Sequence, residues 1–319
     1  MPICRIASQL SAGVKRDFLS PSKVRLALAW GFPYDAFDGQ ARVKPWHIIS
    51  MVESGRALSF NQLPYKQDQT FLSVDRLYVD HNLFQGSAKL DISKALYDIS
   101  LTKTPLTLEK ELLFVGKSSL NVKTDVILSP LGIKLASCEV QSVLVDRETR
   151  RPVPFPDWWM EMYGQFSSPE KQLKVVAEKE PLDVEAAIKT GAQVSSESEP
   201  FDCGVTSVDM VVCASDTDVY GHTNWSAYLK YCIDALASVS HCRKSDYMLK
   251  RAVKTAQIAY KNEGSLGQKI HVRYWRKKMT PNCVHFNVVS CADIEQMLSY
   301  ACVEFYDLTD VSMTNFSKL

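Results

Sequence analysis

Several chemically active side chains lie within nine residues in the second half of the chain. They supply carboxylate, phenol, imidazole and carboxamide groups, at Asp216, Asp218, Tyr220, His222 and Asn224. Apolar residues with helical spacing follow at once, so these groups precede the first turn of a predicted helix. A helix N-terminus offers free backbone N–H groups and a positive dipole, which suit an oxyanion or a polarised carbonyl. The stretch is therefore a candidate catalytic turn.

The same stretch also has a purely structural interpretation. Asp and Asn directly before a helix commonly cap its N-terminus, and Gly221 suits a tight turn. Pattern alone favours capping, whereas the concentration of reactive groups favours catalysis. Both interpretations remain open on these residues.

The elements around this turn are predicted from hydrophobic periodicity. A strand is expected over 205–212, before the turn. The helix after the turn carries apolar residues on one face, at Trp225, Tyr228, Leu229, Cys232, Leu236 and Val239. Alternation of period two then predicts strands around 270–275, 284–288 and 296–306.

The first half of the chain repeats this order. A predicted strand over 24–30 precedes a polar turn, and a helix is expected over 45–60 with Pro45 at its start. Strands are then expected around 70–80, 86–100, 119–128 and 133–146. The repetition indicates an internal duplication of an α+β unit, in which a long helix packs against an antiparallel sheet.

A polar segment with a Ser/Glu-rich end separates the two halves. It spans 161–200 and has few residues able to fill a core, which predicts short surface helices followed by a linker. We therefore expect three parts: residues 1–160, the linker 161–200, and residues 201–319.

Composition excludes several classes of protein. The 319 residues carry a net charge of +1, which gives no bulk electrostatic reason to bind nucleic acid or an anionic membrane. No apolar stretch is long enough to span a membrane, and the N-terminal residues lack the apolar block of a secretory signal. The nine cysteines include no C-x-x-C pair, so buried reduced thiols and a cytoplasmic location are expected.

The candidate turn, together with Tyr228, resembles the active-site turn of hotdog-fold acyl thioesterases. Two branches are similar: the 4-hydroxybenzoyl-CoA thioesterases and the fatty acyl-ACP thioesterases, which carry two hotdog units in one chain. A second similarity lies at 259–263, which we expect to begin a strand and which matches the acyl-ACP thioesterase segment with the catalytic Glu. The resemblance implies a tandem (double) hotdog, each unit being a long helix wrapped by an antiparallel β-sheet.

This resemblance implies hydrolysis of an acyl-CoA or acyl-ACP thioester to free acid and thiol, within fatty acid or related lipid metabolism. Asp218 would activate water or attack the carbonyl directly, His222 would orient or polarise the reacting groups, and Glu263 would position the water. Asn224 would support the turn, and backbone N–H groups near 224–226 would receive the carbonyl oxygen. The resemblance implies no metal and no other cofactor.

Other residues are assigned less directly. Tyr220 stands where acyl-ACP thioesterases usually have Asn, although Tyr-Gly-His occurs in the CoA branch. Trp225 and Tyr228 are expected to contact the substrate, and Arg273 and Arg276 to meet phosphates of CoA or of a carrier's phosphopantetheine.

The first half lacks the Asp/His pairing, because Asp38 and Arg42 occupy the positions of Asp218 and His222. It is therefore expected to shape the acyl pocket or to be structural. Two alternatives remain: a non-catalytic hotdog protein that binds an acyl or polyketide-like ligand, and a hotdog dehydratase or hydratase. The two units are expected to form a monomeric pseudo-dimer or to assemble further as a homodimer.

Overall fold

A computed structural model describes residues 13–61, 70–178, 180, 205–219, 221–242, 251–277, 279–291 and 296–307. The chain divides into two compact units, Met1–Val175 (unit 1) and Val176–Leu319 (unit 2). Unit 1 extends past residue 160 because the following residues pack against it, as when the amide of Ser168 donates to the carbonyl of Leu113 at 3.0 Å. Short helical turns occur between residues 160 and 171, and residues 181–200 of the expected linker lie outside the described part.

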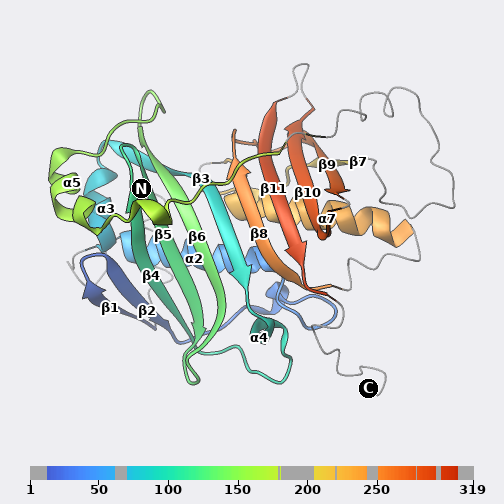
Figure 1. Ribbon diagram of the computed structural model, residues 1–319, viewed down its shortest axis with the longest axis horizontal. Coiled ribbons are helices and arrows are strands. Elements are labelled where there is room, and N and C mark those ends of the chain that lie inside the picture. Colours follow the sequence, from blue (N-terminus) through green and yellow to red (C-terminus); the bar gives the residue numbers. More distant parts are fainter. Residues whose placement is uncertain are drawn as a thin grey trace. The chain divides into compact units, whose positions relative to one another are not determined.

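Unit 1 places one long helix against an antiparallel sheet (Figure 1). The helix α2 (Pro45–Phe60) has Pro45 at its first turn, as predicted. The described strands of unit 1 lie in the order β1-β2-β4-β5-β6-β3. They are β1 (Val14–Ser20), β2 (Lys23–Leu28), β3 (His81–Ile92), β4 (Leu106–Val115), β5 (Ser119–Leu128) and β6 (Ile133–Asp146). The remaining helical turns are η1 (Tyr34–Ala36), η2 (Phe71–Ser73), α3 (Val74–Leu77), α4 (Lys94–Tyr97), α5 (Asp157–Tyr163), η3 (Gly164–Phe166) and η4 (Pro169–Lys171).

Two strand predictions for unit 1 were wrong. Residues 71–77 form helical turns, because Leu72 (φ 59°) and Ser73 (φ 49°) adopt a left-handed backbone that no strand accommodates. The strand expected over 86–100 begins earlier, at His81, and ends at Ile92. Strand β4 was missed because Lys110 interrupts its otherwise apolar buried positions.

Unit 2 repeats the plan with a described sheet in the order β7-β9-β10-β11-β8. The long helix is α7 (Trp225–Cys242), and the turn η5 (Ala214–Asp216) precedes it. The strands are β7 (Thr206–Val211), β8 (Val253–Tyr260), β9 (Lys269–Lys277), β10 (Thr280–Ser290) and β11 (Met297–Phe305). The predicted helix and the four strands predicted from hydrophobic periodicity are present here. Among the described residues, no helix is long and apolar enough to cross a membrane.

The strands of the two units also pair in the same register. In unit 1 one row of paired residues runs Leu26, Leu108, Val126, Ala136. The matching row in unit 2 runs Thr206, Tyr274, Phe286, Ala301. Paired strand positions in these rows therefore have equivalents in the other unit.

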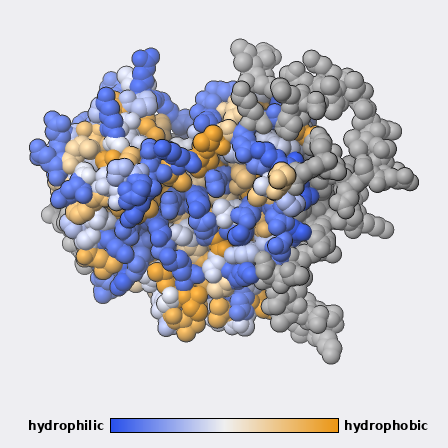
Figure 2. Space-filling view, in the orientation of Figure 1, coloured by the Kyte–Doolittle hydropathy of each residue, from blue (hydrophilic) through white to orange (hydrophobic). Residues whose placement is uncertain are grey.

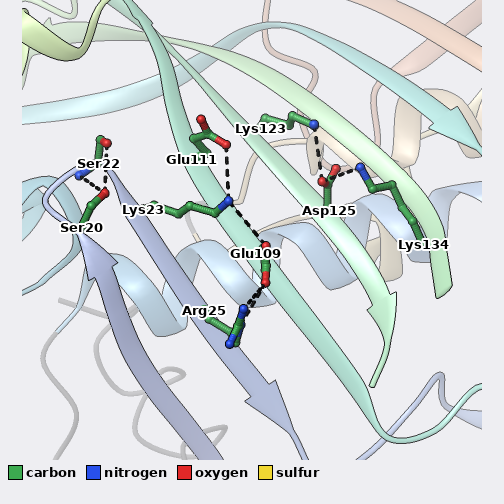
Figure 3. A network of polar contacts seen from close by, with 9 residues as sticks. All are labelled: Ser20, Ser22, Lys23, Arg25, Glu109, Glu111, Lys123, Asp125 and Lys134. Atoms are coloured by element: carbon green, nitrogen blue, oxygen red, sulfur yellow. Dashed lines mark hydrogen bonds and ion pairs between the residues drawn. The ribbon is translucent and has the colours of Figure 1, made fainter. Parts of the chain in front are cut away.

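The sheet faces turned away from the helices differ between the units. In unit 1 this face carries a ladder of ion pairs, in which Lys23 lies 3.6 Å from Glu109 and 3.7 Å from Glu111 (Figure 3). The space-filling view shows this face as largely hydrophilic (Figure 2). At the position of Glu109 unit 2 has Trp275, which is buried and stacked on His285 with ring centroids 5.6 Å apart.

Candidate active site

The candidate turn is a tight hairpin closed by backbone hydrogen bonds. The amide of Asp218 donates to the carbonyl of His222 at 2.7 Å, and the amide of Gly221 donates to the carbonyl of Asp218 at 3.1 Å. Gly221 has φ +77°, a left-handed conformation that glycine adopts without strain. The Asp218 carboxylate accepts from the amide of His222 at 3.2 Å and is half-buried. The hairpin thereby fixes Asp218 and His222 beside each other, while Tyr220 lies outside the described residues.

Asp216, two residues earlier, has a different environment. Its side chain is 4% exposed and lies 2.6 Å from the ammonium of Lys230. Its second carboxylate oxygen accepts from the amide of Cys213 at 3.2 Å. Burial raises the pKa of Tyr231, and the nearby negative charge of Asp216 raises it further. Asp216 is thus a buried structural residue, and Asp218 is the more exposed of the two carboxylates.

Asn224 is the N-cap of α7. Its side-chain oxygen accepts from the amide of Ser226 at 3.0 Å and from the Ser226 hydroxyl at 2.8 Å. Its own amide donates to the carbonyl of Asp216 at 2.7 Å. The capping interpretation is confirmed for this residue. Of the amides near 224–226 that were expected to receive a substrate oxygen, that of Asn224 donates to Asp216 and that of Ser226 donates to the Asn224 side chain.

The loop that carries Glu263 reaches the turn from β8. The amide of Thr223 donates to the carbonyl of Gly264 at 2.8 Å, and His222 forms a bridge with Ser265. This pairing leaves His222 Nδ1 3.7 Å from Glu263 Oε1. The structure therefore brings together His222 and Glu263, which are separated by forty residues of sequence.

The prediction that residues 259–263 begin a strand was wrong. Strand β8 ends at Tyr260, because the amides of Lys261 and Asn262 both donate to the carbonyl of Leu298 and so interrupt the ladder. Glu263 consequently lies in a loop, so the alternating side-chain directions of a strand do not determine where its side chain points.

Tyr228 holds this loop from the first turn of α7. Its hydroxyl accepts from the amide of Gly264 at 3.1 Å and donates to the carbonyl of Asn262 at 3.3 Å. The two bonds flank Glu263 on either side. Burial raises the pKa of Tyr228 to about 12, so the hydroxyl keeps its proton at neutral pH. Trp225 and Tyr228 were expected to contact substrate; both rings are buried and lie against Tyr260, at 6.1 and 5.7 Å between centroids.

Gly264 permits the close approach of the loop to the turn. A Cβ atom at this position would lie 2.5 Å from Thr223 Oγ1 and 3.4 Å from the Tyr228 hydroxyl. The first distance is far below a van der Waals contact, so a side chain here would push the loop from the turn. The sequence pattern did not predict this contact, because it joins segments that are far apart in the chain.

The two predicted phosphate-binding arginines lie further along β9. The turn begins just past Val211, which pairs with Lys269, and Arg273 lies about 13 Å beyond Lys269 along the strand. Arg273 lies 3.8 Å from Glu180, and Arg276 donates to the carbonyl of Pro281. Among the described residues, these two cations therefore have partners within unit 2 itself.

Unit 1 contains the same hairpin with different side chains. The amide of Asp38 donates to the carbonyl of Arg42 at 2.9 Å, and Ala41 takes the left-handed conformation of Gly221, with φ 58°. The Arg42 guanidinium lies 3.0 Å from the Asp38 carboxylate. An ion pair thus replaces the Asp218/His222 arrangement of unit 2.

No protein-family model and no curated protein matches the chain, but solved structures share its fold. One, provisionally described as an oleoyl thioesterase from Lactobacillus plantarum, superposes with a TM-score of 0.59 at 13% identity, covering 94% of this chain and 99% of that one. An acyl-ACP thioesterase from Bacteroides thetaiotaomicron gives 0.56 at 12% identity (90% and 100% covered). A 12:0-ACP thioesterase from Umbellularia californica gives 0.57 at 11% identity (91% and 99% covered). The chain therefore has the same fold as these solved thioesterase structures, as the sequence resemblance predicted.

Proposed function

We propose that the protein is a tandem-hotdog thioesterase that hydrolyses an acyl-CoA or acyl-ACP thioester to a free acid and a thiol, in the cytoplasm. The observation that carries this proposal is the approach of Glu263 to His222, 3.7 Å apart, beside the carboxylate of Asp218. The Glu263 carboxylate thus approaches the His222 imidazole, and the Asp218 carboxylate lies at the His222 backbone amide, before the start of α7 in a fold shared with thioesterases. Unit 2 would carry the chemistry, and unit 1 would hold the acyl chain.

In the proposed reaction, Asp218 accepts a proton from water as the water attacks the thioester carbonyl, or attacks the carbonyl itself. Glu263 faces His222 Nδ1, which leaves Nε2 of the imidazole to polarise the carbonyl or the water. Catalytic contacts of this kind are often long without substrate and tighten when it binds, which suits the 3.7 Å separation. The thiolate then leaves and takes up a proton; in the second route, water then hydrolyses the acyl anhydride formed with Asp218 and releases the free acid.

Because the amide of Asn224 donates to Asp216 and that of Ser226 to the Asn224 side chain, the developing negative charge on the carbonyl oxygen would be stabilised mainly by the His222 side chain and the positive end of α7. We assign Tyr228 to the support of the Glu263 loop rather than to direct substrate contact, since its hydroxyl is occupied by Gly264 and Asn262.

A thiol-release assay against acyl-CoA and acyl-ACP substrates of graded chain length tests the proposal. Release that depends on Asp218 would support it. Wild-type protein that turns over no substrate on either carrier, while retaining a tightly bound acyl ligand, would instead identify a non-catalytic binding protein. Hydration of enoyl thioesters without thiol release would indicate a hydratase.

A further inference from the structure

Gln268 holds Ser265, the residue that pairs with His222. Both main-chain polar groups of Ser265 bind it. The amide of Ser265 donates to the Gln268 side-chain oxygen at 2.8 Å, and the carbonyl of Ser265 accepts from the amide of Gln268 at 3.0 Å. Ser265 in turn forms an isolated β-bridge with His222. A single bridge at an exposed residue opens more readily than a ladder, so its geometry depends on such additional contacts.

The other hydrogen bonds of Gln268 tie it to the sheet of unit 2. Its side-chain Nε2 donates to the hydroxyl of Ser290, at the end of β10, at 3.0 Å. Its carbonyl accepts from the amide of Val212, directly after β7, at 2.9 Å. Ser290 and Val212 are both buried. Gln268 thus connects the exposed Ser265 to two buried points of the same unit.

This clamp acts on the segment that carries Glu263. Ser265 lies two residues after Glu263, and the bridge that it forms brings the loop to the turn. The approach of Glu263 to His222, at 3.7 Å, joins the same two segments. Tyr228 supports the loop as far as Gly264, whose amide donates to its hydroxyl. The hydrogen bonds of Ser265 therefore add a second support, on the other side of Gly264.

The fold closes the equivalent connection differently in unit 1. There the segment between β3 and β4 spans 93–105 and contains the helix α4. The Asp98 carboxylate holds this segment by accepting from the amide and the hydroxyl of Ser100, at 2.9 and 2.7 Å. The hairpin of unit 1 has the Asp38–Arg42 ion pair and no histidine. The glutamine clamp therefore belongs to the unit that carries the candidate catalytic groups, and the architecture of the sheet does not require it.

We propose that Gln268 is a positioning residue, which holds Ser265 and thereby sets the distance between Glu263 and His222. This inference rests on the proposed thioesterase function, in which Glu263 and His222 act together. Because the clamp is partly exposed, water can replace its lost hydrogen bonds, and it contributes little to the stability of the fold. Its effect belongs in kcat, since misplacing a catalytic group by about 1 Å weakens catalysis.

The test compares wild type with Gln268→Met, Gln268→Glu and the control Gln141→Met. Met keeps the length of the side chain without its hydrogen bonds, whereas Glu keeps an oxygen that accepts from the amide of Ser265. Gln141 lies on β6, where its side-chain oxygen accepts from Ser87 at 3.3 Å.

We expect Gln268→Met to lower kcat by about 3- to 10-fold, with KM and the midpoint of urea denaturation nearly unchanged. Gln268→Glu should recover most of the lost kcat, and Gln141→Met should retain the wild-type value. Equal kcat in wild type and Gln268→Met would overturn the proposal. A fall in kcat that Gln268→Glu does not recover would also overturn it.

A double variant separates positioning from a general loss of structure. If Gln268 acts through Glu263, adding Gln268→Met to Glu263→Gln lowers kcat no further than Glu263→Gln alone, because the group that it positions is already lost. Losses that multiply would show that Gln268 acts on something other than Glu263, and would overturn the proposal.

A spectroscopic measurement separates this inference from the proposed function, because it needs no turnover. In nitrogen NMR of isotope-labelled protein, the Nδ1 resonance of His222 reports its contact with Glu263. We expect this resonance to move in Gln268→Met in the same direction as in Glu263→Gln, and to stay in place in Gln141→Met. Such a shift would support the proposal even in a protein that hydrolyses no thioester. An unmoved resonance would overturn it, even in an active thioesterase.

Discussion

The hydroxyl of Tyr228 and the amide of Gly264 are 3.1 Å apart, and this hydrogen bond joins the first turn of α7 to the loop that carries Glu263. The same hydroxyl donates to the carbonyl of Asn262, so a single atom holds the residues on both sides of Glu263. Because Glu263 lies in a loop, its position relative to His222 depends on such contacts rather than on a strand ladder.

Replacing Tyr228 by Phe is therefore expected to lower kcat by about 10-fold or more while the fold persists, since small displacements of a positioned group weaken catalysis strongly. KM should change little if the hydroxyl acts through Glu263 rather than on substrate. Thiol-release kinetics and thermal denaturation measure the two effects. Tyr231→Phe, three residues along α7, removes another buried hydroxyl and serves as the control. An unchanged kcat in Tyr228→Phe would remove Tyr228 from the proposed mechanism.

Asp218→Asn is expected to lower kcat by about 10²- to 10⁴-fold, because the amide cannot act as a base or a nucleophile. The folding free energy should change by less than about 0.5 kcal/mol, since the Asn oxygen still accepts from the amide of His222. Asp38→Asn makes the same change in the equivalent hairpin of unit 1, and it should leave kcat intact. Similar losses in both variants would point to a general effect of the hairpin and not to catalysis by Asp218.

Much of this architecture was predictable because it depends on local patterns. The helix over 45–60 and the strands over 119–128 and 133–146 follow from Pro45 and from simple alternation. Residues 71–77 and β4 were not predictable in this way. The first depends on left-handed backbone at Leu72 and Ser73, and the second has a lysine at a position that the pattern requires to be apolar.

The candidate site shows the same division. Its residue types were evident in the sequence, but their roles depend on contacts between distant segments. Asp216 and Asp218 look alike as a pair, and only the 2.6 Å contact with Lys230 reveals Asp216 as a buried structural acid. Likewise, the amide of Asn224 donates to the carbonyl of Asp216 and that of Ser226 to the Asn224 side chain, and residue spacing does not determine either hydrogen bond.

Gly264→Ala tests the close approach of loop and turn. The added Cβ would meet Thr223 Oγ1 at 2.5 Å, and such overpacking typically costs about 1–3 kcal/mol. We expect a lower denaturation midpoint in urea together with reduced activity. The double variant Gly264→Ala/Thr223→Ala removes the clashing oxygen and should recover most of the lost stability. Gly39→Ala is the control, because a Cβ there meets nothing within 4 Å.

Asp216→Ala is expected to destabilise unit 2 by about 2 kcal/mol, somewhat less than the roughly 3–5 kcal/mol of a fully buried pair, because Lys230 remains 33% exposed. Unit 1 has Ala36 and Ser50 at the equivalent positions. The double variant Asp216→Ala/Lys230→Ser introduces the residue types of unit 1 and should recover part of the lost unfolding free energy. Urea denaturation would measure this recovery. Losses that simply add would indicate that the two side chains do not interact.

Stability should also depend on pH through Lys110. Burial lowers the pKa of Lys110 to about 8, whereas an unfolded lysine titrates near 10.4. Between these values the unfolded chain binds more protons than the folded one, so the free energy of unfolding should rise with pH across this window. The penalty is fully present below about pH 8, and its removal by pH 10.4 is worth about 3 kcal/mol.

Because tyrosines and cysteines titrate in the same range, the measured quantity is the difference in unfolding free energy between wild type and Lys110→Met, obtained by urea denaturation at each pH. The wild type should be the less stable of the two near pH 7 and should approach the variant as the pH rises. A difference that does not vary with pH would show that Lys110 is not a charged group held in the interior of unit 1.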